Sequence, residues 1–256
     1  MREERLILVT NDDGYKASGL NVLVEIAERF GRVVVVAPSE GQSGMSHAIT
    51  VKYPLRLFRP DRESNREMYV CTGTPVDCVK LALNRILPRK PDLILSGINH
   101  GVNSSASVFY SGTIGAAREG IINRIPSIAF SYMDYSLQPD YSSIKEVIYA
   151  IIQKVVENNL VPRYALNVNI PLVKERPLKG IKICRQTQGC WQEEFEKRTD
   201  PHGFDYYWLT GKFVNYEPEA EDTDEWALKN NYVAIVPIHA DATAYEAMKE
   251  LQQWTF

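Results

Sequence analysis

Oxygen-bearing side chains follow three short apolar runs of this sequence, each at the point where the run ends. The runs lie at residues 5–10, 32–38 and 91–95. Because ligands of open parallel sheets bind beyond the carboxyl ends of the strands, we expect these side chains to meet at one edge of a sheet. In chain order the candidates are Asn11, Asp12, Asp13, Ser43, Ser46, Asn99 and Asn103. The sequence therefore predicts a polar ligand site assembled from three separate segments.

The adjacent carboxylates of Asp12 and Asp13 are the most informative pair. Inside a strand, neighbouring side chains point to opposite faces, but Gly14 frees the turn, so both carboxylates can converge on one cation. With a hydroxyl and an amide oxygen they form the donor set of Mg²⁺ or Mn²⁺, without the His and Cys that zinc prefers. The alternative is ordinary turn chemistry, which is the stronger interpretation of Asn-Asp-Asp-Gly taken alone.

Two further loops offer the remaining donors. Ser43 is a candidate hydroxyl ligand. The side-chain amides of Asn99 and Asn103 are candidates to bind a metal ion through oxygen and a phosphate through nitrogen. The alternatives are a flexible Gly-rich connection around Ser43 and turn-forming asparagines. His47 and His100 lie in the same loops, and we expect structural roles for both.

The segment Ser111-Gly112-Thr113 precedes a helix rich in small residues. Free backbone N–H groups at a helix start, together with hydroxyls, accept phosphate oxygens. An ordinary N-cap serine explains the segment equally well by itself. The sequence has no GxGxxG after the first apolar run, no GxxxxGK[ST] and no GxSxG, so the familiar dinucleotide, P-loop and serine-hydrolase motifs are excluded.

The elements that must position these residues alternate between apolar runs and helical periodicity, which predicts an α/β fold with a mostly parallel sheet. Ser18 is the expected N-cap of the first helix. Thr74, Pro75 and Asp77 predict another helix start, with a capping threonine, proline at the first position and an acidic third position. Strands are predicted at residues 5–10, 32–38, 68–73, 91–97 and 126–132, and helices from residues 18, 74, 111 and 142.

The pattern changes beyond about residue 162, which divides the chain into a predicted catalytic core at 1–162 and a C-terminal part at 163–256. The C-terminal part is predicted to complete the core with strands, including 232–238, and to end in a helix at 243–254. The acidic run at 217–225 is predicted to be a solvated loop. The aromatic stretch at 204–216 is expected in the core, with an exposed hairpin that supports assembly as the alternative.

Composition limits the classes of function. The 256 residues are 45% hydrophobic and 24% charged with a net charge of −3, which is ordinary for a globular protein and gives no footprint for a nucleic-acid polymer or an anionic membrane. The apolar runs are too short to span a bilayer or to act as a signal peptide. The four cysteines form no CxxC, and Cys71 and Cys78 fall within a predicted strand and helix. A reduced, cytoplasmic protein is therefore predicted.

Four ordered segments closely resemble the stationary-phase survival protein SurE family. They are ILVTNDDG at 7–14, VVAPSEGQSGMSHAIT at 35–50, TGTPVDCV at 72–79 and SGINHGVN…YSGTIGAAREG at 96–120. The stretch beginning YVAIVPIHAD at 232 resembles the family's C-terminal segment, and between 171 and 229 the likeness is diffuse.

This resemblance implies a metal-dependent phosphatase that cleaves nucleoside 5′- and 3′-monophosphates, in some members with exopolyphosphatase activity. It also implies a Rossmann-like core whose C-terminal hairpin and helix extensions build a homodimer or homotetramer. The family's metal ligands map onto Asp12, Asp13, Ser43 and Asn99, which implies one divalent ion, Mg²⁺ or Mn²⁺, per subunit.

The expected chemistry is phosphomonoester hydrolysis. Asp12 is expected to orient or deprotonate the attacking water, with direct attack by Asp12 as the less favoured variant, while Asp13 holds the metal and Asn11 positions water or phosphate. The expected phosphate contacts are Ser46, Asn99, Asn103, Ser111, Gly112 and Thr113. Two other classes stay open: a nucleotide-binding regulatory module without hydrolysis, and a Mg²⁺-dependent transferase that uses a nucleotide.

Overall fold

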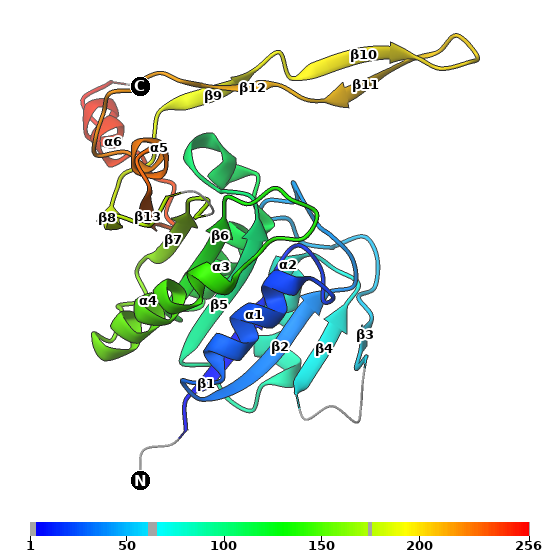
Figure 1. Cartoon of the computed structure of the whole chain (residues 1–256), viewed down its shortest axis with the longest axis vertical. Helices are drawn as coiled ribbons and strands as arrows, with labels where there is room; N and C mark the ends of the chain where they lie inside the picture. The colour runs from blue at the N-terminus through cyan, green and yellow to red at the C-terminus, as the bar shows by residue number, and fades with distance from the viewer. Residues whose placement is uncertain (1–3, 61–65, 174–175, 256) are drawn as a thin grey trace.

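A mostly parallel sheet forms the centre of the molecule (Figure 1). The computed structural model describes residues 4–60, 66–173 and 176–255, and within these ranges nine strands join in the order β3-β4-β2-β1-β5-β6-β7-β13-β8. The six neighbouring strands β4, β2, β1, β5, β6 and β7 all run parallel to one another. At either side of them, β3 is antiparallel to β4, and β13 is antiparallel to β7. The strands are β1 (Leu6–Thr10), β2 (Arg32–Pro38), β3 (Leu57–Phe58), β4 (Glu67–Cys71), β5 (Leu93–His100), β6 (Ser127–Tyr132), β7 (Ala165–Ile170), β8 (Gly180–Ile183) and β13 (Tyr232–Ile238). The predicted α/β class is confirmed.

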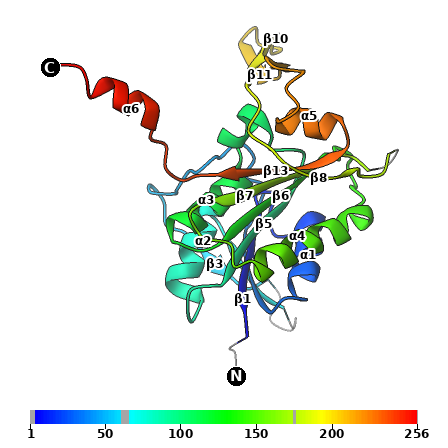
Figure 2. The same ribbon diagram turned by 90° about the vertical axis from the view of Figure 1, so that its left-hand side faces the viewer.

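Helices cover both faces of the sheet (Figure 2). On one face, α1 (Ser18–Ala27) and α4 (Lys145–Glu157) bury their apolar sides against β1, β5, β6 and β7. On the other, α2 (Pro75–Leu81), α3 (Gly112–Ile122) and α5 (Asp224–Lys229) pack over the sheet. Short 3-10 or π segments are η1 (Ala82–Ile86), η2 (Ser105–Phe109) and η3 (Ser142–Ile144). Helices therefore shield both faces of the sheet from solvent, as is typical of parallel sheets.

The N-termini of α1 and α2 test two predictions of helix-capping residues. Thr74 and Asp77 form the reciprocal capping box that the sequence predicts, with Pro75 at the first position of α2. The prediction of Ser18 as an N-cap is wrong: Ala17 takes that position without a side-chain bond, and Ser18 is the first helical residue. The turn before α1 closes with the Ala17 N–H on the Gly14 carbonyl, at 3.1 Å, so the chain enters the helix one residue earlier than expected.

Two antiparallel ribbons extend the chain away from the sheet (Figure 1). The pair β9 (Gly189–Gln192) and β12 (Lys212–Asn215) leads into the pair β10 (Phe195–Thr199) and β11 (Asp205–Leu209). Every residue of β10 and β11 is exposed, so the core prediction is wrong for the aromatic side chains of this hairpin, whereas Phe213 on β12 is half-buried against Trp191. The hairpin of the alternative is present, and its part in assembly stays a prediction. The β10–β11 hairpin extends away from the central sheet, so its aromatic side chains do not pack against either face of that sheet. The terminal helix α6 (Tyr245–Leu251) is also exposed throughout and lies away from the sheet in Figure 2.

The acidic run at 217–225 is only partly a solvated loop. Glu217 and Asp222 bind the guanidinium of Arg185, at 2.6 and 2.7 Å. Asp224 is 1% exposed, and its carboxylate accepts the N–H groups of Ser105 and Thr187, at 2.9 and 3.0 Å. The solvated-loop prediction is therefore wrong for Asp224, because buried N–H groups of two distant segments need this acceptor.

The division at residue 162 stays a prediction, and the central sheet itself includes β7, β8 and β13 from beyond it. All four cysteines are free, and Cys71 and Cys78 are buried in β4 and α2 as the sequence predicts. Across residues 4–60, 66–173 and 176–255, no helix has the length and apolar character needed to cross a membrane.

Candidate active site

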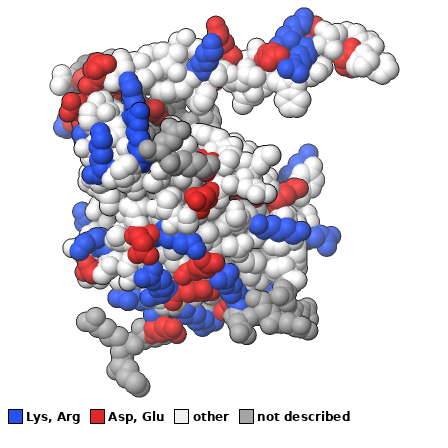
Figure 3. All heavy atoms as spheres, in the orientation of Figure 1, with Lys and Arg blue, Asp and Glu red and all other residues white. Residues whose placement is uncertain are grey.

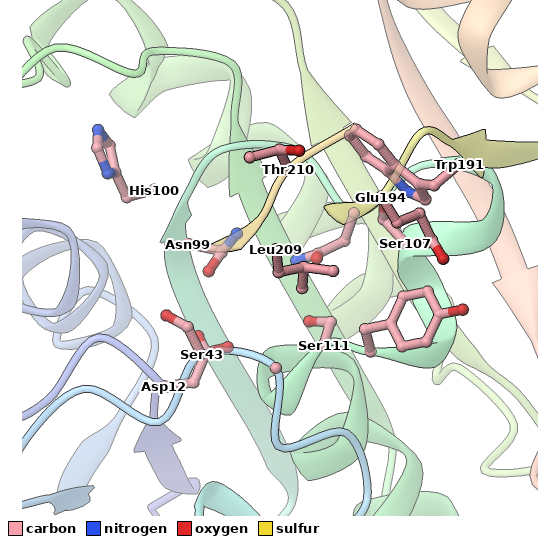
Figure 4. A pocket seen from close by; sticks show the side chains of 13 residues that line it. Asp12, Ser43, Asn99, His100, Ser107, Ser111, Trp191, Glu194, Leu209 and Thr210 are labelled. Atoms are coloured by element: carbon pink, nitrogen blue, oxygen red, sulfur yellow. The ribbon is translucent and has the colours of Figure 1, made fainter. Parts of the chain in front are cut away.

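A cavity of about 600 Å³ opens where β1, β2 and β5 end (Figure 4). Five of the side chains predicted from the sequence line it, and they come from four segments of the chain. These are Asp12, Ser43, Asn99, Asn103 and Ser111. The parallel order β2-β1-β5 places the carboxyl ends of these strands side by side, which explains why residues so distant in sequence meet.

Asp12 lies at the floor of this cavity, two residues after the end of β1, and is 4% exposed. Its Oδ1 accepts the hydroxyl hydrogen of Thr113. Gly112 lies against it: a Cβ at this position would be 3.0 Å from the Cβ of Asp12 and 3.2 Å from its Oδ2. Burial raises the pKa of Asp12 to about 6; the Thr113 bond opposes this rise and the charge of Asp13 adds to it. Gly112 and Thr113 therefore both contact Asp12 directly, and their expected phosphate contacts stay a prediction.

Asn99 lines the cavity with Asp12, whereas Asp13 is half-buried and does not line it, so its role as a metal ligand stays a prediction. The Oδ2 of Asp13 accepts the backbone N–H of His100 at 3.2 Å, and burial raises the pKa of this carboxyl. The side-chain amide of Asn99 donates to the Gly101 carbonyl at 2.7 Å, which fixes the nitrogen and leaves the amide oxygen available. In Figure 4 that oxygen lies on the side of Asp12.

Ser43 belongs to a loop that is tied to its surroundings at two points. The N–H of Gln42 donates to the Asp12 carbonyl at 2.7 Å. The N–H of Ser46 donates to the Tyr110 carbonyl at 3.0 Å, and the Ser46 hydroxyl donates to the Phe109 carbonyl at 2.6 Å. Ser46 therefore anchors the loop and does not line the cavity, so its phosphate contact stays a prediction.

Ser111 and Asn103 also line the cavity. Ser111 is the N-cap of α3 and accepts the N–H of Ile114 at 3.1 Å, so the capping interpretation is confirmed while the side chain also lines the cavity. Asn103 donates its amide to the hydroxyl of Ser131 at 2.9 Å, and its backbone N–H to Asn169 at 2.7 Å. These bonds fix the position of Asn103 in the cavity lining.

Three other candidates have structural partners. Asn11 is fully buried, and its amide donates to the Gly14 carbonyl at 2.9 Å to close the turn, so a catalytic role stays a prediction. His47 lies 3.0 Å from the carboxylate of Glu119. The ring of His100 lies 2.9 Å from the Ser136 carbonyl, although the residue also lines the cavity.

Sequence reasoning missed six residues that line the cavity. These residues come from the β9–β12 ribbon and its continuation, and from η2 and the residue after it. They are Trp191, Glu194, Leu209, Thr210, Ser107 and Tyr110. No local pattern predicts which surface a hairpin will cover. The one available signal was the place of Tyr110 directly before the predicted Ser111.

The donor set fits a hard divalent cation. Within the described ranges no group of three or more His, Cys, Asp and Glu gathers, so the site offers two carboxylates with a hydroxyl and an amide oxygen instead. Asp12 is buried and Asp13 is half-buried, and the cavity lining of the described chain contains no Lys or Arg. Adjacent carboxylates in such surroundings need a counter-ion, and oxygen donors of these types suit Mg²⁺ or Mn²⁺.

The fold and this cavity define an α/β protein with an acidic, oxygen-lined ligand site beyond its parallel strands. The sequence model of the family described as Survival protein SurE matches residues 7–193. The chain belongs to this family.

Its relatives extend over nearly the whole length. It is 52% identical to the 5'-nucleotidase SurE of Flavobacterium psychrophilum, over 97% of each chain. It is 51% identical to the 5'-nucleotidase SurE of Christiangramia forsetii, over 99% of this chain and 98% of the relative. Among solved structures, the SurE protein from Aquifex aeolicus is similar with a TM-score of 0.83 and 40% identity, covering 96% of this chain and 98% of that one. The predicted family is confirmed.

Proposed function

We propose that this chain is a divalent-metal-dependent phosphomonoesterase that hydrolyses nucleoside 5′- and 3′-monophosphates to nucleoside and phosphate. The observation that carries the proposal is the meeting of Asp12, Ser43 and Asn99 on one cavity, with Ser111 and the start of α3 beside them. Relatives at about half identity that are named 5'-nucleotidase support the same activity.

Asp12, Asp13, Ser43 and Asn99 would hold one Mg²⁺ or Mn²⁺ per subunit. Bound there, the ion would neutralise charge on the phosphate and lower the pKa of a water molecule. The raised pKa of Asp12 and of Asp13 reflects two carboxylates whose ionised forms are poorly solvated in the absence of a cation, which supports this assignment.

The remaining residues bind the phosphate and handle the proton. Asn103 and Ser111 would donate to non-bridging oxygens, together with the N–H groups that begin α3 at Gly112 and Thr113. A water molecule in line with the ester oxygen attacks phosphorus, and Asp12 orients it or accepts its proton. In the less favoured variant, Asp12 itself attacks.

Phosphate release from AMP and GMP, with and without EDTA, tests the activity. Metal-dependent hydrolysis is expected. Nucleotide binding without turnover would replace the proposal with a regulatory module, and activity that needs an activated nucleotide donor would replace it with a transferase. Polyphosphate and 3′-AMP in the same assay define the range of substrates.

Single substitutions test the metal ligands. Asp12→Asn and Asp13→Asn should abolish turnover and weaken Mg²⁺ binding while the thermal unfolding transition remains cooperative. Asp205→Asn, a matched change on the exposed strand β11, should leave activity unchanged. Full activity of either site variant at saturating Mg²⁺ would overturn the assignment.

We infer that the chain forms a homodimer or homotetramer. The exposed rings of the β10–β11 hairpin, such as Tyr207 and Trp208 at 58% exposure each, and the exposed helix α6 support this, since large apolar side chains in water mark contact surfaces. Light scattering of the intact protein and of Trp208→Ser tests it.

The charged side chains on the face shown in Figure 3 are interspersed in sign, in keeping with small-molecule substrates rather than a nucleic-acid polymer. A cytoplasmic location stays a prediction.

A further inference from the structure

The cavity has two chemically different ends. Asp12, Ser43 and Asn99 form an acidic, oxygen-rich end at the edge of the sheet. Figure 4 shows Trp191 and Glu194 on the opposite side of the cavity, carried there by the ribbon that begins with β9. A nucleoside monophosphate has the same polarity, with its phosphate at one end and a flat, partly apolar base at the other.

Trp191 is built to present an aromatic surface to the cavity. It is 38% exposed, and its cross-strand partner Phe213 meets the indole at an interplanar angle of 63° with the ring centroids 6.0 Å apart. This edge-on contact covers at most one face of the indole. Phe213 is itself confined, because a Cβ at Gly189 would be 2.4 Å from its ring. The indole is thus supported from one side and open to a second planar group.

Glu194 supplies the polar complement near Trp191. Its backbone carbonyl accepts the N–H of Thr210 at 2.7 Å, which fixes this part of the ribbon. Its carboxylate lines the cavity and has no hydrogen bond or ion pair with the part of the chain that the structure describes. A free carboxylate beside an aromatic ring suits a vicinal diol, whose two hydroxyls can donate to its two oxygens.

We propose that Trp191 and Glu194 form the nucleoside end of the site: Trp191 stacks on the base, and Glu194 accepts hydrogen bonds from the ribose 2′- and 3′-hydroxyls. This inference rests on the proposed nucleotidase function and narrows it. A substrate held in this way carries its phosphate on the 5′-oxygen and is a ribonucleotide. The wild-type protein therefore prefers AMP to 2′-deoxy-AMP and to 3′-AMP.

The test compares substrates that have or lack the groups in question. With Mg²⁺ present, KM and kcat are measured for AMP, 2′-deoxy-AMP, 3′-AMP and ribose 5-phosphate, which has no base. Trp191→Ala should raise KM for AMP about tenfold, the scale of base stacking on an aromatic side chain, with little change in kcat and none for ribose 5-phosphate. Trp191→Phe should retain most of the affinity. Glu194→Gln should reduce the preference for AMP over 2′-deoxy-AMP.

A matched control lies on the adjoining hairpin. Glu196→Gln changes a residue of the same type as Glu194 on β10, outside the cavity lining, and should leave all four substrates unaffected. Equal losses for AMP and ribose 5-phosphate in Trp191→Ala would show a structural role and overturn the inference, as would an unchanged KM. A wild-type protein that hydrolyses none of the four substrates would overturn the proposed function instead.

Discussion

Thr113, near the start of α3, donates its hydroxyl hydrogen to Asp12, at the end of β1. Both side chains are buried, and the two residues are 101 positions apart in the sequence. The bond lowers the pKa of Asp12 against the larger effect of burial. Thr113 therefore fixes the orientation of the central carboxylate and helps to keep it ionised, although it does not line the cavity itself.

Thr113→Val should lower kcat for AMP by about 10- to 100-fold, because a hydrogen bond to a charged group contributes roughly 1.5–3 kcal/mol. Valine has nearly the same shape but supplies no donor, so Asp12 loses its partner and its pKa rises further. Steady-state kinetics with a Mg²⁺ titration measures both effects. Thr113→Ser keeps the hydroxyl and should remain close to wild type; equal losses in both variants would mean that packing, not the bond, matters.

Gly115→Ala should disturb the loop that carries Ser43. Alanine favours a helix by about 1 kcal/mol over glycine, yet a Cβ at this position would be 2.3 Å from the Ser46 carbonyl oxygen. The loop must move, and displacement of a ligand by even about 1 Å can cost on the order of 100-fold in rate. We expect weaker Mg²⁺ binding and lower activity, read by calorimetry and phosphate release.

Gly41→Ala is the control for that change. Gly41 lies in the same loop, with open space around the position of an added Cβ. The variant should retain activity and metal affinity. Loss of function in Gly41→Ala but not in Gly115→Ala would contradict the idea that contact between the loop and α3 positions Ser43.

The site could be predicted from the sequence where topology alone decides position. Continuous apolar runs identify β1, β2 and β5, and in a parallel sheet their carboxyl ends share one edge, so Asp12, Ser43 and Asn99 had to lie near one another. The capping box at Thr74 is equally local. The strands of the fold and the acidic end of the cavity follow from such signals.

The other end of the cavity could not be predicted in this way. Trp191 and Glu194 reach it because a ribbon of exposed strands covers η2, and neither periodicity nor turn chemistry encodes that placement. The same limit applies to Asp224, whose buried role depends on N–H groups of segments 37 and 119 residues away. Long-range contacts of single polar residues leave no pattern in a sequence without aligned relatives.

Metal-free protein should become less stable as pH rises from about 4 to 6 relative to its Asp12→Asn variant. The folded pKa of Asp12 lies at about 6, above the ordinary 3.8, so the folded state binds this proton more tightly than the unfolded state. Ionisation therefore opposes folding once the pH exceeds 4, and the effect is complete above about 6. A shift of this size corresponds to about 3 kcal/mol at most.

Urea unfolding in EDTA at several pH values measures this difference. The two proteins should unfold alike near pH 4, and Asp12→Asn should be the more stable above pH 7. Added Mg²⁺ should stabilise the wild type and not the variant. A wild type that is more stable than Asp12→Asn at pH 8 without metal would show that the carboxylate is already compensated by the protein.

Asp224→Ala should lower both stability and activity, although Asp224 lies outside the cavity lining. One carboxylate oxygen accepts the N–H of Ser105 at 2.9 Å, and the other accepts the N–H and hydroxyl of Thr187 at 3.0 and 2.5 Å. Ser105 begins η2 with a φ of +47°, a left-handed conformation that needs support from outside. Buried donors without an acceptor cost about 1–3 kcal/mol each, so we expect a loss of about 2–4 kcal/mol in the free energy of unfolding.

The effect on activity arises because η2 carries Ser107 and leads to Tyr110, and both line the cavity. Asp224→Ala should therefore raise KM for AMP at temperatures at which circular dichroism shows that the variant is still folded. Glu221→Ala, an exposed carboxylate of the same acidic run, is the control and should change neither property. If Asp224→Ala is destabilised but keeps the wild-type KM, η2 holds its position without this anchor, and the cavity wall does not depend on it.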